Sequence, residues 1–375
     1  MTEGATLRSC APLDRRIAAR IARLGPITVA EYMAEALTHP KHGYYMTGDP
    51  FGARGDFVTA PEISQMFGEL IGLWCADTWQ RMGAPDPVLL VELGPGRGTL
   101  LADALRAARV VPAFLRALRL QLVEVSPALR ARQRATLTAA ARATGAAPHW
   151  HDGLEGVPDG PLLLIANEFF DALPVRQFER RPEGWCERVV TLAPDGGSLA
   201  FALAPAGAQA AALVPAELRE APPGSLVEVS VPAIVLAGEI GRRLAAHGGA
   251  ALVIDYGRAR PRAGATLQAL RRHAPHAVLA DPGTADLTAH VDFSALARAA
   301  AEAGAQAHGP VDQGDFLAAL GLGARAAALR ESATPAQAAD IASAAARLSD
   351  PAQMGRSYKA LALTRAGFGP PAGFA

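Results

Sequence analysis

Three glycines at alternate positions stand between an apolar run and a helical stretch. Gly94, Gly96 and Gly98 follow the run Val88–Leu93, and Glu92 lies two residues before the first of them. A glycine turn between a strand and a helix brings backbone N–H groups close to a ligand at the helix N-terminus. The loop therefore predicts a bound ligand, although a plain strand-to-helix turn is the alternative.

The spacing and the acid indicate which ligand this is. A dinucleotide fingerprint reads G-x-G-x-x-G and would need glycine at position 99, where the chain has Thr99. Glu92 can contact the ammonium group of a methionine moiety, directly or through water, but suits an anionic pyrophosphate poorly. We therefore expect S-adenosyl-L-methionine as cofactor, with S-adenosylhomocysteine as product. A nicotinamide-dependent oxidoreductase is the weaker alternative.

Two further acids follow the next predicted strands. Glu124 lies 26 residues beyond Gly98, at a strand C-terminus where an acid can accept hydrogen bonds from both ribose hydroxyls. Asp152 follows the third strand and is a candidate acceptor for the adenine amino group. For Asp152 a solvated loop acid is an equally good interpretation.

Strands and helices alternate around these residues. Strands are predicted at 88–93, 118–125, 147–150 and 161–166, and helices at 99–108 and 128–141. This rhythm is typical of a parallel sheet with crossover helices. It returns with a helix at 233–246, a strand at 250–254, a helix at 292–304, a strand near 306–311, helices to about 348 and a strand at 358–364.

Other stretches interrupt the alternation. Antiparallel strands are predicted at 175–178, 185–192 and 226–229, the segment 256–290 is expected to be mostly loop, and alanine-rich surface helices are expected at 205–214 and 324–347. Near the N-terminus, Leu13, Ile17, Ile21 and Leu24 have helical spacing, so we interpret this arginine-rich segment as a first helix rather than a transit peptide. A capping-box pattern at Thr28 and Glu31, a loop over 39–61 and a helix over 62–82 follow.

Composition excludes some classes of function. The 36 basic and 36 acidic residues cancel, so the bulk charge favours neither nucleic acid nor an anionic membrane as partner. Cys10, Cys75 and Cys186 are widely spaced and odd in number, which indicates neither a disulfide framework nor a metal site. No apolar run approaches about 20 residues, so no membrane-spanning helix is expected. We expect a cytoplasmic bacterial protein without a metal.

Several motifs together resemble the MidA-like family of class I methyltransferases. The resemblance covers about Ile27 to Arg365 and is most specific in two segments, Gly55–Gln65 and Ala166–Pro174. The other matching motifs are Glu31–Met33, His39–Tyr45, the glycine loop, Ile254–Gly257 and Asp286–Phe293. The family includes a mitochondrial complex I assembly factor that methylates protein arginine.

The resemblance implies a Rossmann-like α/β fold with a seven-strand methyltransferase sheet. It also implies a helical N-terminal segment (1–87) that closes over the site, and a core (88–375) with insertions at about 172–231 and 256–290. The implied activity is protein-arginine N-methylation of a respiratory complex I subunit during assembly. The partner would then be a protein that bears the acceptor arginine. A catalytically silent assembly factor that binds S-adenosylmethionine is the alternative.

An arginine acceptor gives the acids after the fourth strand a role. Carboxylates bind the N–H groups of a guanidinium, concentrate its charge on the remote nitrogens and can take the released proton. Glu168 is the main candidate for this role. Asp171 shares the site or caps the following turn, and Asn167 holds either the acceptor nitrogen or the cofactor.

The remaining candidates come from the resemblance. Thr59, Glu62 and Gln65 belong to the segment that closes over the cofactor in the family, although Thr59 and Glu62 also fit a helix-capping pair. His290 resembles the histidine of a Thr-His-Trp element near the active site of arginine methyltransferases, but a structural histidine is the commoner interpretation.

Overall fold

The computed structural model describes residues 12–47, 59–145, 147–194 and 196–374. The chain folds into two compact units. The first draws its described residues from Met1–Pro50, Leu173–Ser230 and Ala263–Ala289; the second draws them from Phe51–Ala172, Val231–Arg262 and His290–Ala375. The proposed closing role of residues 1–87 stays a prediction. All the candidate site residues lie in the second unit.

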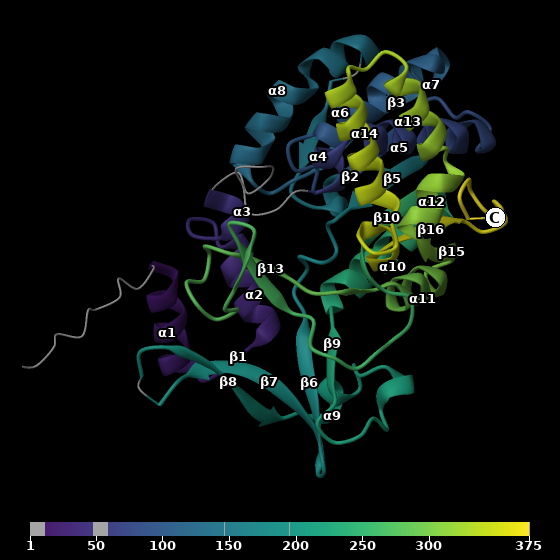
Figure 1. Cartoon of the computed structure of the whole chain (residues 1–375). Coiled ribbons are helices and arrows are strands. Elements are labelled where there is room, and N and C mark those ends of the chain that lie inside the picture. Colours follow the sequence, from purple (N-terminus) through teal and green to yellow (C-terminus); the bar gives the residue numbers. More distant parts are fainter. Residues whose placement is uncertain (1–11, 48–58, 146, 195, 375) are drawn as a thin grey trace, which may run out of the picture. The chain divides into compact units, whose positions relative to one another are not determined.

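The second unit is built on a mostly parallel sheet (Figure 1). Its strands are β2 (Val88–Leu93), β3 (Leu118–Val123), β4 (His149–His151), β5 (Leu162–Asn167), β10 (Gly249–Arg258), β14 (Val291–Asp292), β15 (Ala305–Asp312) and β16 (Tyr358–Arg365). Their order is β15-β16-β10-β5-β2-β3-β4, with β14 paired to the end of β10. Only β16 runs antiparallel to its neighbours in this path of described strands. The predicted α/β fold is confirmed.

The strand order explains where a ligand can bind. From β2 the chain moves outward through β3 to β4, then returns to β5 on the other side of β2. The loops after β2 and β5 therefore diverge at the C-terminal edge of the sheet. Such a topological switch point is where open α/β sheets bind ligands.

Helices cover both faces of this sheet. They are α4 (Ala60–Ile63), α5 (Gln65–Arg81), α6 (Thr99–Ala107), α7 (Pro112–Ala117), α8 (Pro127–Thr144), α10 (Val231–His247), α11 (Phe293–Glu302), α12 (Gln313–Ala319), α13 (Leu322–Arg330), α14 (Pro335–Ser349) and α15 (Met354–Ser357). Helices α10 and α11 pack against each other and against β15 and β16. The alanine-rich helices expected at 324–347 are found as α13 and α14.

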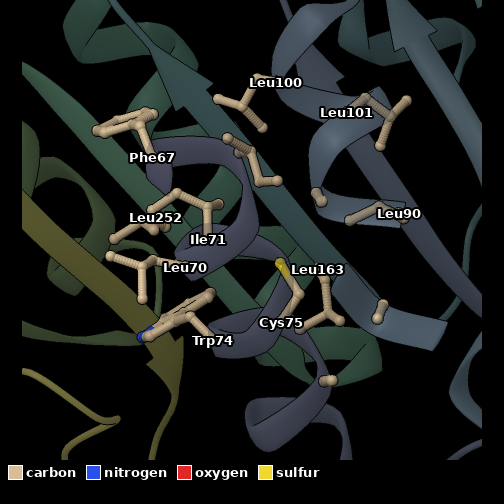
Figure 2. Close-up of a cluster of buried hydrophobic side chains, with 14 of the residues drawn as sticks. Phe67, Leu70, Ile71, Trp74, Cys75, Leu90, Leu100, Leu101, Leu163 and Leu252 are labelled. Atoms are coloured by element: carbon tan, nitrogen blue, oxygen red, sulfur yellow. The ribbon is translucent and has the colours of Figure 1, made fainter. Parts of the chain in front are cut away.

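Helix α5 supplies much of the core on its side of the sheet (Figure 2). Its apolar side chains meet Leu90, Leu163 and Leu252 from three neighbouring strands. Gly68 and Gly72 let α5 approach α6 closely, because a Cβ at Gly72 would lie 2.3 Å from the carbonyl oxygen of Ala104. Protein interiors are close-packed, so a side chain there would push the two helices apart.

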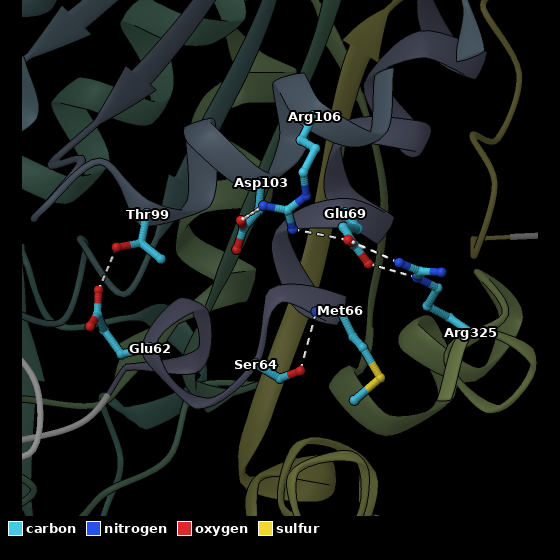
Figure 3. A network of polar contacts seen from close by, with 8 residues as sticks. All are labelled: Glu62, Ser64, Met66, Glu69, Thr99, Asp103, Arg106 and Arg325. Carbon is cyan, nitrogen blue, oxygen red and sulfur yellow. Dashed lines mark hydrogen bonds and ion pairs between the residues drawn. The ribbon is translucent and has the colours of Figure 1, made fainter. Parts of the chain in front are cut away.

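A charged network fixes the same helices to one another (Figure 3). The buried carboxylate of Glu69 on α5 accepts a hydrogen bond from Arg106 at 2.9 Å and two from Arg325 at 2.7 and 3.1 Å. Arg106 also pairs with Asp103 at 2.6 Å. The two guanidinium groups hold the pKa of Glu69 below its usual value against the opposing effect of burial. This network joins α5, α6 and α13 around the core that supports the glycine loop.

The first unit contains helices α1 (Pro12–Leu24), α2 (Val29–Thr38), α3 (Tyr44–Thr47) and α9 (Ala208–Ala211), and strands β1 (Ile27–Thr28), β6 (Arg176–Arg181), β7 (Gly184–Leu192), β8 (Leu199–Pro205), β9 (Leu226–Val229), β11 (Gln268–Arg271), β12 (Ala274–His276) and β13 (Asp286–Thr288). The predicted first helix and the antiparallel β6, β7 and β9 are confirmed. So is the capping box, in which Thr28 and Glu31 exchange hydrogen bonds.

One expectation for this unit was wrong in extent. The surface helix expected at 205–214 is only the single turn α9, and its first residue, Pro205, ends β8. In β8, Phe201 pairs with Val190 of β7, and pairing with a neighbouring strand overrides the helix propensity of alanine. The segment 256–290 is mostly loop, as expected, and it also holds the small sheet β12-β11-β13.

Candidate functional site

The glycine loop (Gly94–Gly98) turns directly from β2 into α6. Gly94, Gly96 and Gly98 all have positive φ, at 59°, 53° and 81°. Side-chain-bearing residues adopt this conformation at a cost. Gly94 has a second constraint, because a Cβ there would lie 2.7 Å from the ring of Phe169. The turn therefore depends on glycine for its backbone and, at Gly94, for its close packing.

Glu92 is the acid beside this loop. It sits on β2, is 3% exposed, and its Oε2 has no hydrogen-bond partner among the described residues. Burial raises the pKa of Glu92 to about 8. A buried carboxylate oxygen without a partner is costly, and a ligand ammonium would satisfy it. This observation fits the methionine end of S-adenosylmethionine.

Glu124 lies just after β3, where the sequence analysis placed it. The carboxylate accepts hydrogen bonds from the backbone of Ser126 at 2.8 Å and from Gln133 at 3.1 Å. Burial raises the pKa of Glu124, and these two hydrogen bonds oppose the shift. Gln133 of α8 also donates to the Gly96 carbonyl at 2.8 Å and accepts from Trp150 at 2.8 Å. The buried side-chain amide of Gln133 thus links the glycine loop to Glu124, the residue expected to bind the ribose.

Asp152 lies in a different environment from Glu124. Its side chain is 85% exposed and pairs with Arg130 at 2.5 Å. Arg130 also donates to the backbone carbonyl of Glu124 at 2.6 Å. The pair therefore connects the loops after β3 and β4 at the surface, and a role for Asp152 toward adenine stays a prediction.

Helix α4 contacts both the glycine loop and the turn after β5. Glu62 accepts a hydrogen bond from Thr99 Oγ1 at 2.6 Å (Figure 3). It also pairs with Arg97 at 3.4 Å. The alternative of a capping pair is borne out only in position: Thr59 is at the N-cap, but its side chain makes no cap bond, and the Glu62 N–H donates to the Thr59 carbonyl at 2.9 Å. The Glu62 side chain contacts α6 instead of the N-cap. Thr59 is buried, whereas Gln65 is exposed at the start of α5.

The turn after β5, residues 167–171, is called the β5 turn below. Glu168 has a positive φ of 49° and is partly buried. Its Oε1 accepts from the backbone N–H of Ala60 at 2.7 Å and from Asn167 at 3.3 Å, and its Oε2 accepts from the Tyr358 hydroxyl at 3.2 Å. The Asn167 side-chain oxygen is buried without a partner in the described part of the chain.

Burial and neighbouring groups shift the pKa values of the two carboxyl groups in this turn, Glu168 and Asp171. Burial raises the pKa of Glu168 to about 7; the hydrogen bond from Ala60 lowers it, and the charge of Asp171 raises it. Burial also raises the pKa of Asp171 to about 6, against the effect of Tyr256. Perturbed carboxylates that converge at a switch point are typical of functional sites.

Three residues that the sequence analysis did not select also belong to this site. The sequence gives no sign that Gln133 belongs to the site, because no pattern distinguishes a buried polar residue of a helix from an exposed one. Tyr358 stands at the start of the final strand and reaches Glu168 only through the strand order. Asp255 directly follows the apolar run 250–254, much as Glu124 follows the run of β3, so its position did carry a signal.

Two tyrosines contact the acids, Tyr358 at Glu168 and Tyr256 at Asp171. The Tyr256 ring lies edge-on to Tyr358 at 5.6 Å and to His290 at 5.3 Å. His290 is exposed, and its catalytic role stays a prediction. Within the described ranges, no group of histidine, cysteine or acidic residues is arranged to hold a metal ion.

Comparison with known proteins gives consistent matches. The sequence model of a family described as "Putative S-adenosyl-L-methionine-dependent methyltransferase" matches residues 70–311. The mitochondrial protein arginine methyltransferase NDUFAF7 of Mus musculus is 39% identical over 381 residues, covering 96% of this chain and 86% of the relative. Its Drosophila melanogaster homolog is 40% identical over 378 residues, covering 94% and 84%.

A solved structure matches over nearly the whole chain. It is a protein from Burkholderia thailandensis bound to S-adenosylhomocysteine, with a TM-score of 0.83 and 32% identity, covering 98% of this chain and 97% of that one.

No helix in the described portion is both long and apolar enough to cross a membrane.

Proposed function

The chain belongs to this family of S-adenosyl-L-methionine-dependent methyltransferases, and we propose that it methylates an arginine side chain of a protein. The observation that carries the proposal is the β5 turn, which places Glu168 and Asp171 together at the sheet edge beside the glycine loop. Phe169 packs on Gly94, so the turn and the loop are in direct contact.

A guanidinium acceptor needs a carboxylate beside it, and the β5 turn supplies two. It stays protonated in water and its lone pair is delocalised, so it is a poor nucleophile. S-adenosylmethionine supplies an electrophilic methyl group on a sulfonium. Glu168 would bind two guanidinium N–H groups and concentrate the positive charge away from the attacking nitrogen. The ionised carboxylate would also accept the proton that the methylated nitrogen releases.

The cofactor would be held by groups on the other side of the site. Glu92 would accept from the ammonium of the methionine moiety, the glycine loop would approach it closely, and Glu124 would accept from the ribose hydroxyls. Thr59, Glu62 and Gln65 would close the site from the N-terminal side, with Asp152 near the adenine. Asn167 and Asp171 would orient the acceptor, and His290 would line its approach.

The acceptor protein is proposed from the relatives and the family resemblance. The curated relatives are named protein arginine methyltransferases, and the family resemblance suggests a subunit of respiratory complex I during assembly. We place the reaction in the bacterial cytoplasm. In support of this, both cysteines in the described residues, Cys75 and Cys186, are free thiols.

Methylarginine mapping tests the proposal. A strain that lacks the gene is complemented with the wild type, with Glu168→Gln, or with Glu155→Gln, which changes an exposed acid of the same unit. We expect arginine methylation to be lost in the deletion and Glu168→Gln strains and restored by the other two. Purified Glu168→Gln should still bind S-adenosylhomocysteine within about threefold of wild type, a difference below 1 kcal/mol.

Two results would contradict this. If the deletion strain loses no methylarginine, the acceptor is not arginine. If Glu168→Gln restores respiratory growth as fully as the wild type, the protein acts as a cofactor-binding assembly factor without transferring a methyl group.

A further inference from the structure

Asp255 sits beneath the β5 turn and uses both of its oxygens on the backbone. Its Oδ2 accepts hydrogen bonds from three consecutive N–H groups, those of Phe169, Phe170 and Asp171, at 3.1, 3.0 and 3.2 Å. Its Oδ1 accepts from the Tyr256 N–H at 2.9 Å. Successive backbone N–H groups around a left-handed residue form an anion-binding concavity. Here the carboxyl group of Asp255, a side chain of the same protein, occupies the concavity, and burial together with the charges of Asp171 and Glu168 raises the pKa of Asp255.

From this geometry we infer that Asp255 is the positioning residue for Glu168 and Asp171. The inference rests on the proposed function for its catalytic part. Asp255 is fully buried, so its carboxylate does not face an acceptor. It acts through the turn, since the three N–H groups that it binds follow Glu168 directly.

Glu168 needs such support because of its backbone. Its φ of 49° is an unfavourable conformation for a residue with a side chain. The Glu168 N–H is held by the carbonyl of Ile254 at 2.8 Å, one residue before Asp255. The end of β10 thus fixes the turn on both sides of the strained residue and aims its carboxylate.

The three acids therefore have different roles. In the proposed function Glu168 and Asp171 orient the acceptor, while the two carboxyl oxygens of Asp255 are engaged by four backbone hydrogen bonds. Asp255→Asn keeps the size of the side chain but replaces one acceptor oxygen with an NH2 group. That group cannot accept, so at least one set of these N–H groups loses its partner.

The experiment compares wild type, Asp255→Asn and Asp103→Asn. Asp103 is a matched control, since it is a buried aspartate of the same unit whose partner is Arg106 rather than the β5 turn. Three quantities are measured: exchange rates of the amides at 169–171, affinity for S-adenosylhomocysteine by calorimetry, and transfer of tritiated methyl groups to proteins from the deletion strain.

For Asp255→Asn we expect faster exchange at all three amides and cofactor affinity within about threefold of wild type. Methyl transfer should fall about 100-fold, the effect of displacing a reacting group by about 1 Å. Asp103→Asn should lose thermal stability without changing the exchange or the transfer rate. A general loss of structure would instead weaken cofactor binding and transfer together.

Unchanged exchange at 169–171 in Asp255→Asn, or unchanged transfer despite faster exchange, would overturn the inference. If Asp255→Asn does not fold, the wild type decides, because rapid exchange of these amides in the intact protein would equally exclude the positioning role. If wild type transfers no methyl group to arginine while the exchange depends on Asp255, the proposed function fails and the support of the turn stands.

Discussion

The glycine loop and the β5 turn lie side by side but are held in different ways. The loop owes its shape to its own residues, three glycines with positive φ within five positions. The β5 turn owes its shape to distant ones, since its contacts come from α4, β10 and β16. The cofactor side is therefore encoded locally, and the acceptor side is assembled by the fold.

This difference affects how each region should respond to change. A loop that depends on its own backbone fails when one glycine is replaced. A turn supported from several elements should lose function in steps, as one support after another is removed.

Gly94→Ala should abolish cofactor binding. The substitution adds backbone strain at φ 59° and a clash at 2.7 Å with Phe169. Together these cost about 3–4 kcal/mol, so affinity for S-adenosylhomocysteine should fall at least about 100-fold by calorimetry. Gly321→Ala is the control, because Gly321 has φ 91° with open space around it. If both variants bind equally, the local basis of the loop is wrong.

Glu92→Gln should weaken cofactor binding and raise the stability of the cofactor-free protein at pH 8. Loss of a charge-assisted hydrogen bond to the ammonium should weaken S-adenosylhomocysteine about 30-fold. The folded pKa of Glu92, about 8, lies above the ordinary 4.5, so wild type loses stability as pH rises from about 5 to 8. Glutamine does not titrate, so the cofactor-free variant should melt at a higher temperature than wild type at pH 8. The difference should vanish near pH 5, and its absence at pH 8 would contradict a buried, unpartnered Glu92.

Methyl transfer should rise with pH through about 7. The ionised form of Glu168 is required and its pKa is raised to about 7, so the rate should fall roughly tenfold per unit at pH values well below that. Tyr358→Phe removes a hydrogen bond to the carboxylate and should move the midpoint upward while leaving the rate at high pH nearly unchanged. A midpoint that Tyr358→Phe leaves in place would show that another group controls the profile.

Gln133→Leu should have the smallest effect. It removes hydrogen bonds to Glu124 and to the Gly96 carbonyl, which together contribute about 1 kcal/mol, so affinity for S-adenosylhomocysteine should fall about fivefold. The isolated 5′-methylthioadenosine moiety should lose the same factor, because it carries the ribose but not the ammonium. A loss confined to the full ligand would place Gln133 on the methionine side instead.

The central sheet could be predicted because its strands are continuous apolar runs. Val88–Leu93 is buried at every position and was placed at its observed bounds. Strand β8 is alanine-rich and strands β11, β12 and β13 are short, so these strands acquire their conformation from pairing partners and could not be predicted. Gln133 and Tyr358 were missed for a related reason: their importance lies in contacts to residues far away in the chain.

The sequence by itself determined the cofactor and the family, because the glycine loop and its neighbouring acid are contiguous and their spacing is a direct consequence of backbone geometry. It also placed Glu168 after the fourth strand. Only the tertiary structure decided how that acid is held: Asp255 beneath the turn, Ala60 on one oxygen and Tyr358 on the other. Strand order brings these residues together, and strand order depends on the packing of the whole sheet rather than on any local pattern.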